Sequence, residues 1–255
     1  MTLAEERREV QRDDCIFYHT SVLRDGTVID GPWDLRGHES QYLGTVDFRR
    51  KRVLECGPAT GFLTYEMERR GADVIGFEVG YDLSIDLLPF ERDDLRLKKI
   101  EHINQIIGPV QNSWWFMHRE QNSRAKMVYG SIYDLPGDIG EFDIATLQAI
   151  MLHLRDPFSA LEQVARRTRQ CIIVTDVIDA AIEETGHDGM RFHPTRTFGN
   201  WTSWWSFSPA SIVAMLDVLG FHKTRVSYHT QMNHVHHDME RAAVPIKMFT
   251  VVGEA

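Results

Sequence analysis

Two glutamates and two glycines stand where nucleotide-binding chemistry would need them. Glu55 ends a short apolar run, and Gly57 and Gly61 follow it in a tight loop. Residues 62–70 are typical of a helix, and the next apolar run ends in Glu78. A strand, a glycine loop, a helix and a second strand that ends in an acid form a nucleotide-binding βαβ unit.

The spacing of the loop does not suit a pyrophosphate. The dinucleotide fingerprint is Gly-x-Gly-x-x-Gly. Here Glu55 takes the place of the first glycine, and three residues separate Gly57 from Gly61. No lysine of the P-loop type follows Gly61. The loop therefore favours a ligand that carries an adenosine and an ammonium but no phosphate.

The same residues match a known motif. Class I methyltransferases that depend on S-adenosylmethionine (SAM) have the first motif Glu/Asp-x-Gly-x-x-x-Gly. The segment Glu55-Cys56-Gly57-Pro58-Ala59-Thr60-Gly61 agrees with it at every defined position, and Glu78 follows at the right distance. The chain therefore resembles this family, over roughly residues 45–180. The alternative is a structural strand–turn–helix that binds no ligand.

The resemblance implies an α/β fold: a Rossmann-like seven-stranded methyltransferase sheet with helices on both faces and an antiparallel last strand. We expect a single methyltransferase domain over residues 1–255, with an N-terminal cap segment at 1–45. Two insertions, at about 85–125 and 177–207, are expected to lie over the active site.

Some element boundaries also follow from local signals. Residues 1–20 look like a charged helix. A helix with isoleucines at helical spacing between Ile100 and Ile107 is expected to end at Gly108-Pro109. Residues 221–232 and 244–252 are expected to form a closing pair of antiparallel strands.

The resemblance further implies which residues hold SAM. Glu55 would anchor the loop and complement the positive charge of the ligand, and Glu78 would accept both ribose hydroxyls. Ser131 and Ile132 would flank the adenine, although Ser131 stands where the family usually has an acid. Gln148 would line the path of the methyl group. The full expected cofactor set is Glu55, Gly57, Pro58, Gly61, Glu78, Val79, Ser131, Ile132 and Gln148.

Aromatic residues and histidines are expected on the acceptor side. The substrate-binding candidates are Tyr18, Trp33, Trp114, Trp201 and Trp205, and the catalytic candidates are His153, His19 and His193. Packing in the core is the alternative for Trp114. For His153 the alternative is that it holds its loop in place. If the acceptor is a hydroxyl, one of the histidines would take its proton.

Composition favours a small-molecule partner. The formal net charge is −9, and such a charge does not attract nucleic acid or an anionic membrane over long distances. The three cysteines lie far apart, which predicts neither a disulfide framework nor a thiolate zinc site, and a cytoplasmic location follows. Residues 1–10 lack the apolar stretch of a signal peptide, and no run approaches the length of a membrane span.

One group of histidines, at 234–237, stands close in sequence to Asp238 and raises the question of a metal. The group has neither the helical His-x-x-x-His spacing nor cysteines beside it. A polar hairpin end is the preferred interpretation, and no bound metal is expected.

Short islands near the N-terminus resemble a narrower family, the bacterial tRNA wobble-uridine (carboxy)methyltransferases and their small-molecule relatives. These islands are Tyr18-His19, Asp25-Gly26, and Gly31 with Trp33-Asp34. The predicted function is in-line transfer of a methyl group from SAM to an oxygen or nitrogen of a small molecule. The alternatives are a tRNA-modifying enzyme that uses SAM or carboxy-SAM, a SAM-binding protein that does not methylate, and an enzyme that uses SAM for a non-methyl reaction.

Overall fold

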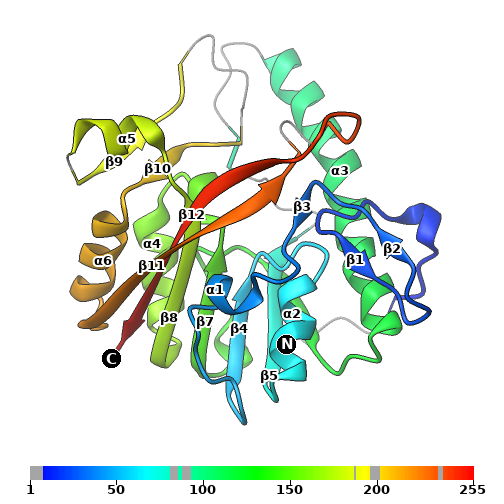
Figure 1. Cartoon of the computed structure of the whole chain (residues 1–255), viewed down its shortest axis with the longest axis horizontal. Helices are drawn as coiled ribbons and strands as arrows, with labels where there is room; N and C mark the ends of the chain where they lie inside the picture. Colours follow the sequence, from blue (N-terminus) through cyan, green and yellow to red (C-terminus); the bar gives the residue numbers. More distant parts are fainter. Residues whose placement is uncertain (1–7, 81–85, 88–92, 187, 196–201, 235–237) are drawn as a thin grey trace.

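An eight-stranded sheet carries the other elements of this protein, in the strand order β3-β11-β12-β8-β7-β4-β5-β6 (Figure 1). The structure is a computed structural model, and it describes residues 8–80, 86–87, 93–186, 188–195, 202–234 and 238–255. The strands of the sheet are β3 (Trp33–Asp34), β4 (Arg52–Cys56), β5 (Asp73–Val79), β6 (Lys126–Gly130), β7 (Phe142–Gln148), β8 (Thr168–Val177), β11 (Lys223–Asn233) and β12 (Val244–Glu254).

The pairing of the strands follows the expected methyltransferase arrangement with one addition. The strands β6, β5, β4, β7 and β8 pair in parallel, whereas β12 is antiparallel to both β8 and β11. The antiparallel last strand and the closing pair are therefore confirmed. The expected count of seven strands is wrong, because Trp33 and Asp34 pair with Asn233 and Met232 and add β3 to the edge of the sheet.

Helices cover both faces of the sheet, as expected. On one face lie α1 (Glu39–Tyr42), α2 (Phe62–Arg69) and α3 (Asp93–Glu120), and on the other lie α4 (Pro157–Ala165) and α6 (Pro209–Val218). The central strands are mainly apolar because both of their faces are largely buried. The remaining elements are η1 (Arg12–Asp14), β1 (Ser21–Val22), β2 (Val28–Ile29), η2 (Gly137–Ile139), η3 (Met151–His153), α5 (Ala180–Thr185), β9 (Met190–Phe192) and β10 (Trp205–Phe207).

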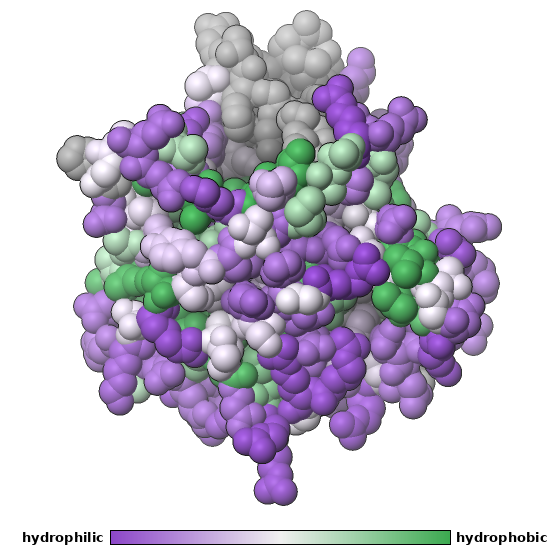
Figure 2. Space-filling view, viewed as in Figure 1, coloured by the Kyte–Doolittle hydropathy of each residue, from purple (hydrophilic) through white to green (hydrophobic). Residues whose placement is uncertain are grey.

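The surface in view is mainly hydrophilic, with a few separate hydrophobic patches (Figure 2). One patch lies over the hairpin of β1 and β2, where Val22 and Val28 are exposed. Within the described ranges, no helix combines the length and the apolar character that a membrane crossing requires.

The N-terminal segment is mostly extended. Between residues 8 and 20 the helical part is the short η1, so the expected helix over 1–20 is wrong for its described portion. Residues 1–7 lie outside the described chain. The backbone donors of this segment find partners far along the chain instead of in a helix. Ile16 N–H donates to the carbonyl of Pro109 at 3.0 Å, and Tyr18 N–H donates to Thr60 Oγ1 at 2.8 Å.

The long helix α3 runs through Gly108 and Pro109, where the sequence predicts its end. Pro109 has no N–H to donate to the carbonyl of Gln105, one turn earlier. The second half of the helix is nevertheless deeply buried, and Ser113 and Trp114 have no exposed surface. Burial of large apolar side chains there outweighs the lost hydrogen bond, so the helix continues.

This interpretation of α3 predicts that Pro109→Ala stabilises the protein. The substitution restores the N–H of a helix-interior position and lets it reach the Gln105 carbonyl. We expect the free energy of unfolding to rise by roughly 1–2 kcal/mol, after allowance for the extra freedom of alanine in the unfolded chain. Urea unfolding followed by circular dichroism measures the change. A fall in stability would mean that Pro109 is needed for the contact with the N-terminal segment.

Candidate active site

Parallel pairing brings the predicted cofactor residues to one edge of the sheet. The strands β5, β4 and β7 are neighbours and run in the same direction, so their C-terminal ends lie side by side. Glu55 is near the end of β4, Glu78 is near the end of β5, and Gln148 is the last residue of β7. Ligands of open α/β sheets bind at this edge, which makes it the candidate active site.

The loop after β4 requires its glycines for conformation and for packing. Gly57 has φ +71° and Gly61 has φ +85°, both in the left-handed region that favours glycine. A Cβ on Gly57 would lie 2.5 Å from Cγ2 of Ile150, and a Cβ on Gly61 would lie 2.7 Å from the rings of Trp114 and Tyr65. Side chains at these positions would therefore disturb both the loop and the helix that follows it.

Thr60, inside the same loop, joins it to two other parts of the fold. Its side chain is fully buried, and its Oγ1 accepts the backbone N–H of Tyr18 at 2.8 Å and of His19 at 3.3 Å. The hydroxyl of Ser113, on α3, lies 3.1 Å from the same oxygen. One hydroxyl thus holds the N-terminal segment and the long helix against the glycine loop.

Glu55 is buried, with only 3% of its surface exposed. Its carboxylate accepts a hydrogen bond from the hydroxyl of Thr64, on α2, and that hydroxyl oxygen accepts the indole N–H of Trp114 at 3.2 Å. Burial raises the pKa of Glu55 to about 8, and the neighbouring carboxyl of Glu78 adds to the rise. The carboxyl is therefore largely protonated at neutral pH unless a cation lies beside it.

Glu78 and Val79 lie at the tip of β5, close to the glycine loop. One carboxylate oxygen of Glu78 accepts the backbone N–H of Val79 at 2.9 Å. Burial raises the pKa of Glu78, and backbone hydrogen bonds from Val79 and Ala59 oppose that rise. The carbonyl of Val79 in turn accepts the side-chain amide of Gln111, on α3, at 2.9 Å.

Pro58, Ser131, Ile132 and Gln148 complete the predicted cofactor set. Pro58 is buried and packs close to Gly76 of β5. Ser131 Oγ accepts the N–H of Tyr133 at 3.3 Å in the turn after β6, and Ile132 is half-buried. Both side-chain amide atoms of Gln148 are buried and have no hydrogen-bond partner within the described chain. Such atoms need a water or a ligand.

Tyr18, His19 and Trp33 are the expected acceptor-side residues that lie in the N-terminal cap segment. Trp33 donates its indole N–H to the Tyr18 hydroxyl at 3.0 Å, and the rings of Tyr18 and His19 lie 5.2 Å apart. Burial lowers the pKa of His19 to about 4, so its ring is neutral at pH 7. Its Nδ1 is buried and lacks a partner among the described residues.

The other tryptophans differ in their surroundings. Trp114 belongs to the hydrophobic core and has no exposed surface, which replaces its expected role in substrate binding with the alternative of packing. Trp205 is half-buried on β10, and its indole N–H donates to the carbonyl of Arg155 at 3.2 Å. Trp201 lies outside the described residues.

His153 and His193 both have partners that explain their positions. Nδ1 of His153, in η3, lies 2.7 Å from the carbonyl oxygen of Thr202, which agrees with the alternative that this residue holds a loop. Nε2 of His193 lies 2.5 Å from the hydroxyl of Ser206 and 3.8 Å from a carboxylate oxygen of Asp179. Burial lowers the pKa of His193, and Arg191 contributes to this.

Asp176 is a further acid at this edge of the sheet, and the sequence analysis did not include it among the candidates. It stands near the end of β8 with 4% of its surface exposed; one carboxylate oxygen accepts the N–H of Val177 at 2.8 Å. The other oxygen, Oδ2, has no partner in the described part of the protein. Burial raises the pKa of Asp176 to about 7. The signal was available, because Asp176 ends an apolar run as Glu55 and Glu78 do.

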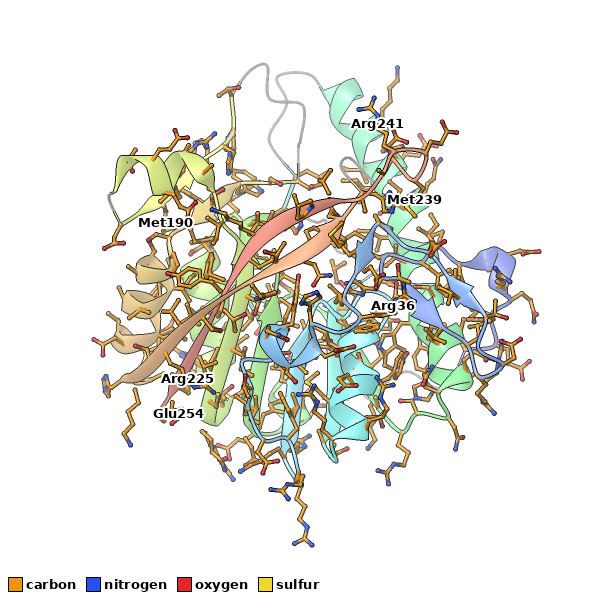
Figure 3. All side chains as sticks on the ribbon, in the orientation of Figure 1. Arg36, Met190, Arg225, Met239, Arg241 and Glu254 are labelled. Carbon is orange, nitrogen blue, oxygen red and sulfur yellow. The ribbon has the colours of Figure 1, made fainter. Side chains whose placement is uncertain are left out.

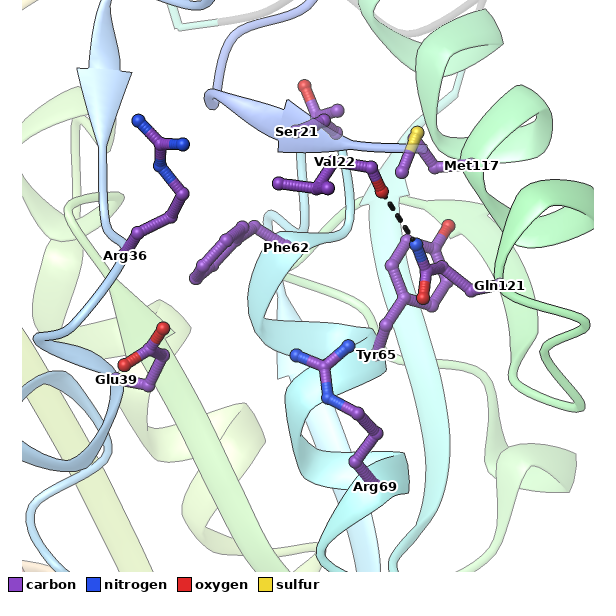
Figure 4. A pocket seen from close by; sticks show the side chains of 10 residues that line it. Ser21, Val22, Arg36, Glu39, Phe62, Tyr65, Arg69, Met117 and Gln121 are labelled. Atoms are coloured by element: carbon purple, nitrogen blue, oxygen red, sulfur yellow. Dashed lines mark hydrogen bonds between the residues drawn. The ribbon is translucent and has the colours of Figure 1, made fainter. Parts of the chain in front are cut away.

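A separate cavity of about 190 Å³ lies between α2, α3, β1 and α1 (Figure 4). Phe62 projects into it, with Arg36 and Glu39 on one side and Gln121 on the other (Figure 4). Its two arginines are already paired, Arg36 with Asp34 and Arg69 with Glu66. Among its described lining residues, both arginines therefore already have a carboxylate partner.

Across the described residues, no group of three or more His, Cys, Asp and Glu side chains is placed to hold a metal ion. The histidine group at 234–237 falls largely outside the described chain. His234 is described, and its Nδ1 lies 2.7 Å from the carbonyl oxygen of Arg241.

Comparisons with known proteins bear on this arrangement. No protein-family model matches the chain. Among curated proteins, the chain is 28% identical over 160 residues to an uncharacterized methyltransferase of Schizosaccharomyces pombe, an alignment that covers 58% of this chain and 49% of that protein. The chain thus spans about half the length of the curated relative it matches.

Two solved structures illustrate the similarity of fold. The N-terminal domain of EvdMO1, determined in the presence of S-adenosylhomocysteine (SAH) and D-fucose, is 17% identical with a TM-score of 0.53, and the match covers 96% of this chain and 93% of that one. The 1,6-didemethyltoxoflavin-N1-methyltransferase of Burkholderia thailandensis, with 1,6-didemethyltoxoflavin and SAH bound, is 12% identical with a TM-score of 0.51, and the match covers 87% and 78%. The expected class I methyltransferase fold is confirmed.

The position of Thr60 predicts that Thr60→Val destabilises the protein while Thr60→Ser does not. Valine keeps the shape of the side chain but leaves the N–H of Tyr18 without its acceptor. We expect a loss of roughly 1–3 kcal/mol in the free energy of unfolding for the valine variant. Urea unfolding measures it, and limited proteolysis should cut the N-terminal segment faster. Equal stability of the two variants would show that the hydroxyl is dispensable.

The raised pKa of Glu55 predicts that Glu55→Gln gains stability relative to the wild type as the pH rises. Between about pH 4.5 and 8 the folded protein keeps a proton that the unfolded chain releases, so wild-type stability falls as pH rises through this window. Glutamine has no such proton. Relative to wild type, the variant should gain roughly 2–4 kcal/mol between pH 5 and 9, in urea unfolding without ligand. Parallel stability curves would contradict the assignment.

Proposed function

We propose that this chain is a SAM-dependent methyltransferase that transfers a methyl group to an oxygen or nitrogen of a small molecule. The observation that carries the proposal is the pair of acids at the tips of adjacent strands, the buried Glu55 and the half-buried Glu78, beside a loop without phosphate-binding features. Carboxyls at these positions offer a pyrophosphate no positive charge, and a cation beside them favours their ionised form. The fold supports the same assignment.

The residues at the strand tips suit this cofactor. We infer that Glu78 accepts the ribose hydroxyls and that Ser131 and Ile132 flank the adenine. Glu55 becomes ionised when the positive charge of the ligand lies near it. The unpartnered amide of Gln148 then gains a hydrogen-bonding partner in the ligand. Gly57 and Gly61 keep the loop clear of side chains where the ligand passes, and Pro58 and Val79 support it.

The protein has two tasks in such a reaction. SAM, when bound, supplies the methyl group and carries its own leaving group. The chain must hold the acceptor in line and exclude water. We propose that the N-terminal cap at 1–45 and the segments at 85–125 and 177–207 do this, with Tyr18, Trp33 and Trp205 facing the acceptor side. The direct attachment of Tyr18 and His19 to the glycine loop supports a role for the cap.

A hydroxyl or ammonium acceptor must also lose a proton. Asp176 Oδ2 is the group best suited to hold it, because burial raises the pKa of Asp176 to about 7, close to the pH of the reaction. The pKa of His19, lowered to about 4, makes His19 a weaker base. His153 and His193 are committed to other partners in their loops.

A small acceptor has more support than tRNA. The formal net charge of −9 does not attract a polyanion. One structural relative was determined in the presence of D-fucose and the other with 1,6-didemethyltoxoflavin bound, and both compounds are small molecules. The tRNA-modifying alternative therefore has less support than a small-molecule acceptor.

Calorimetry with SAH tests the proposed cofactor. We expect SAH to bind and Glu78→Ala to weaken binding by roughly 10- to 100-fold, because a carboxylate that accepts two hydroxyls is lost. Asp73→Asn is the matched control, since Asp73 is exposed at the opposite end of the same strand. Tight binding of NADH, with no response to SAH, would exclude the proposal.

A further inference from the structure

The far end of β11 carries buried polar groups that no part of the mechanism uses. His229, Gln231 and Asn233 alternate along the strand and share one face of it. Gln231 has no exposed surface, and neither its amide oxygen nor its amide nitrogen has a partner among the described residues. Both ring nitrogens of His229 are likewise buried and unpartnered there.

The register of the sheet places these residues beyond the tips of the parallel strands. Val177, the last residue of β8, pairs with Met248 of β12, and Met248 pairs with His229. Gln231 is two residues further along β11, past the end of β8. The hairpin of β11 and β12 continues past the parallel strands, with Arg225 and Glu254 at one end and Met239 and Arg241 at the other (Figures 1 and 3).

The same face of β11 looks toward the N-terminal cap. The ring of His229 lies 5.1 Å from that of Tyr42, and Asn233 donates its side-chain amide to the carbonyl of Pro32 at 3.1 Å. Trp33 pairs with Asn233 and donates its indole N–H to the Tyr18 hydroxyl. The backbone N–H of Tyr18 in turn donates to Thr60 Oγ1 of the glycine loop. A continuous set of contacts therefore connects this face to the candidate active site.

An unpartnered buried amide is costly, because it gives up its hydrogen bonds to water and gains none in the fold. Natural proteins keep such groups when a water or a ligand satisfies them. We propose that His229 and Gln231 hydrogen-bond the methyl acceptor, and that this acceptor is a neutral molecule rich in hydroxyl groups. The inference rests on the proposed function, since it names the substrate class of the same site.

The chemistry of the unpartnered side chains supports a neutral, hydroxyl-rich ligand. The amides of Gln231 and Gln148 each offer both donors and an acceptor, which matches hydroxyl groups that both give and accept hydrogen bonds. Burial lowers the pKa of His229 to about 4, so its ring is uncharged at pH 7. The nearby charge of Asp34 is neutralised by Arg36 at 2.6 Å.

The test uses D-fucose as the neutral hydroxyl probe, with D-galacturonate and indole as anionic and aromatic comparisons. Binding to the full chain, saturated with SAH, is measured by ligand-observed NMR. We expect D-fucose to bind more tightly than either comparison. Gln231→Leu should weaken the affinity for D-fucose at least fivefold and leave the affinity for SAH within twofold. The midpoint of its urea unfolding should stay the same or rise. Thr230→Val, exposed on the opposite face of the same strand, is the matched control.

Several results would overturn the inference. One is preferential binding of indole or galacturonate; another is a lowered unfolding midpoint for Gln231→Leu, which would show that the amide is bonded within the fold. His229→Phe gives a second measurement, because it keeps the ring beside Tyr42 and removes both nitrogens; unchanged D-fucose binding in this variant counts against the inference. If SAH binds and D-fucose does not, the inference is wrong and the proposed cofactor is unaffected. If D-fucose binds and SAH does not, the proposed cofactor is wrong and the polar site is unaffected.

Discussion

The hydroxyl of Thr60 is the contact on which the arrangement of the site depends. It lies in the glycine loop, has no exposed surface, and accepts backbone N–H groups from Tyr18 and His19. The hydroxyl of Ser113 on α3 lies beside it. The cap, the loop and the long helix therefore meet at one buried oxygen. A buried polar atom with several partners allows little displacement, so the position of each part determines the positions of the others.

Around this contact, acids near the ends of three strands control the charge of the site. Glu55, Glu78 and Asp176 belong to β4, β5 and β8, and burial raises the pKa of each carboxyl. Their ionised forms are costly while no cation is near, because a buried charge loses its hydration. A positively charged ligand lowers that cost. Burial thus shifts the pKa of the same kind of side chain in the same direction at all three strand ends.

Much of the fold could be predicted from local patterns. The apolar runs that end in acids and the glycine loop between them identified the parallel strands. Three expectations failed because contacts between segments far apart in sequence outweighed the local pattern. The N-terminal segment is extended because Thr60 and Pro109 accept its backbone donors. The helix α3 passes Pro109 because its second half is buried, and Trp114 lies in the core for the same reason.

The sequence by itself determined which residues stand at the strand tips, since that depends on the spacing of a few neighbours along the chain. Glu55, Gly57, Gly61 and Glu78 are therefore found where the motif predicts them. Only the tertiary structure decided which polar groups keep partners and which lose them. Tyr18 and Thr60 hydrogen-bond although they are 42 positions apart in sequence. Gln231 is fully buried, although it lies on a strand whose other residues are mostly exposed. Burial is set by contacts between distant segments, and no local pattern records it.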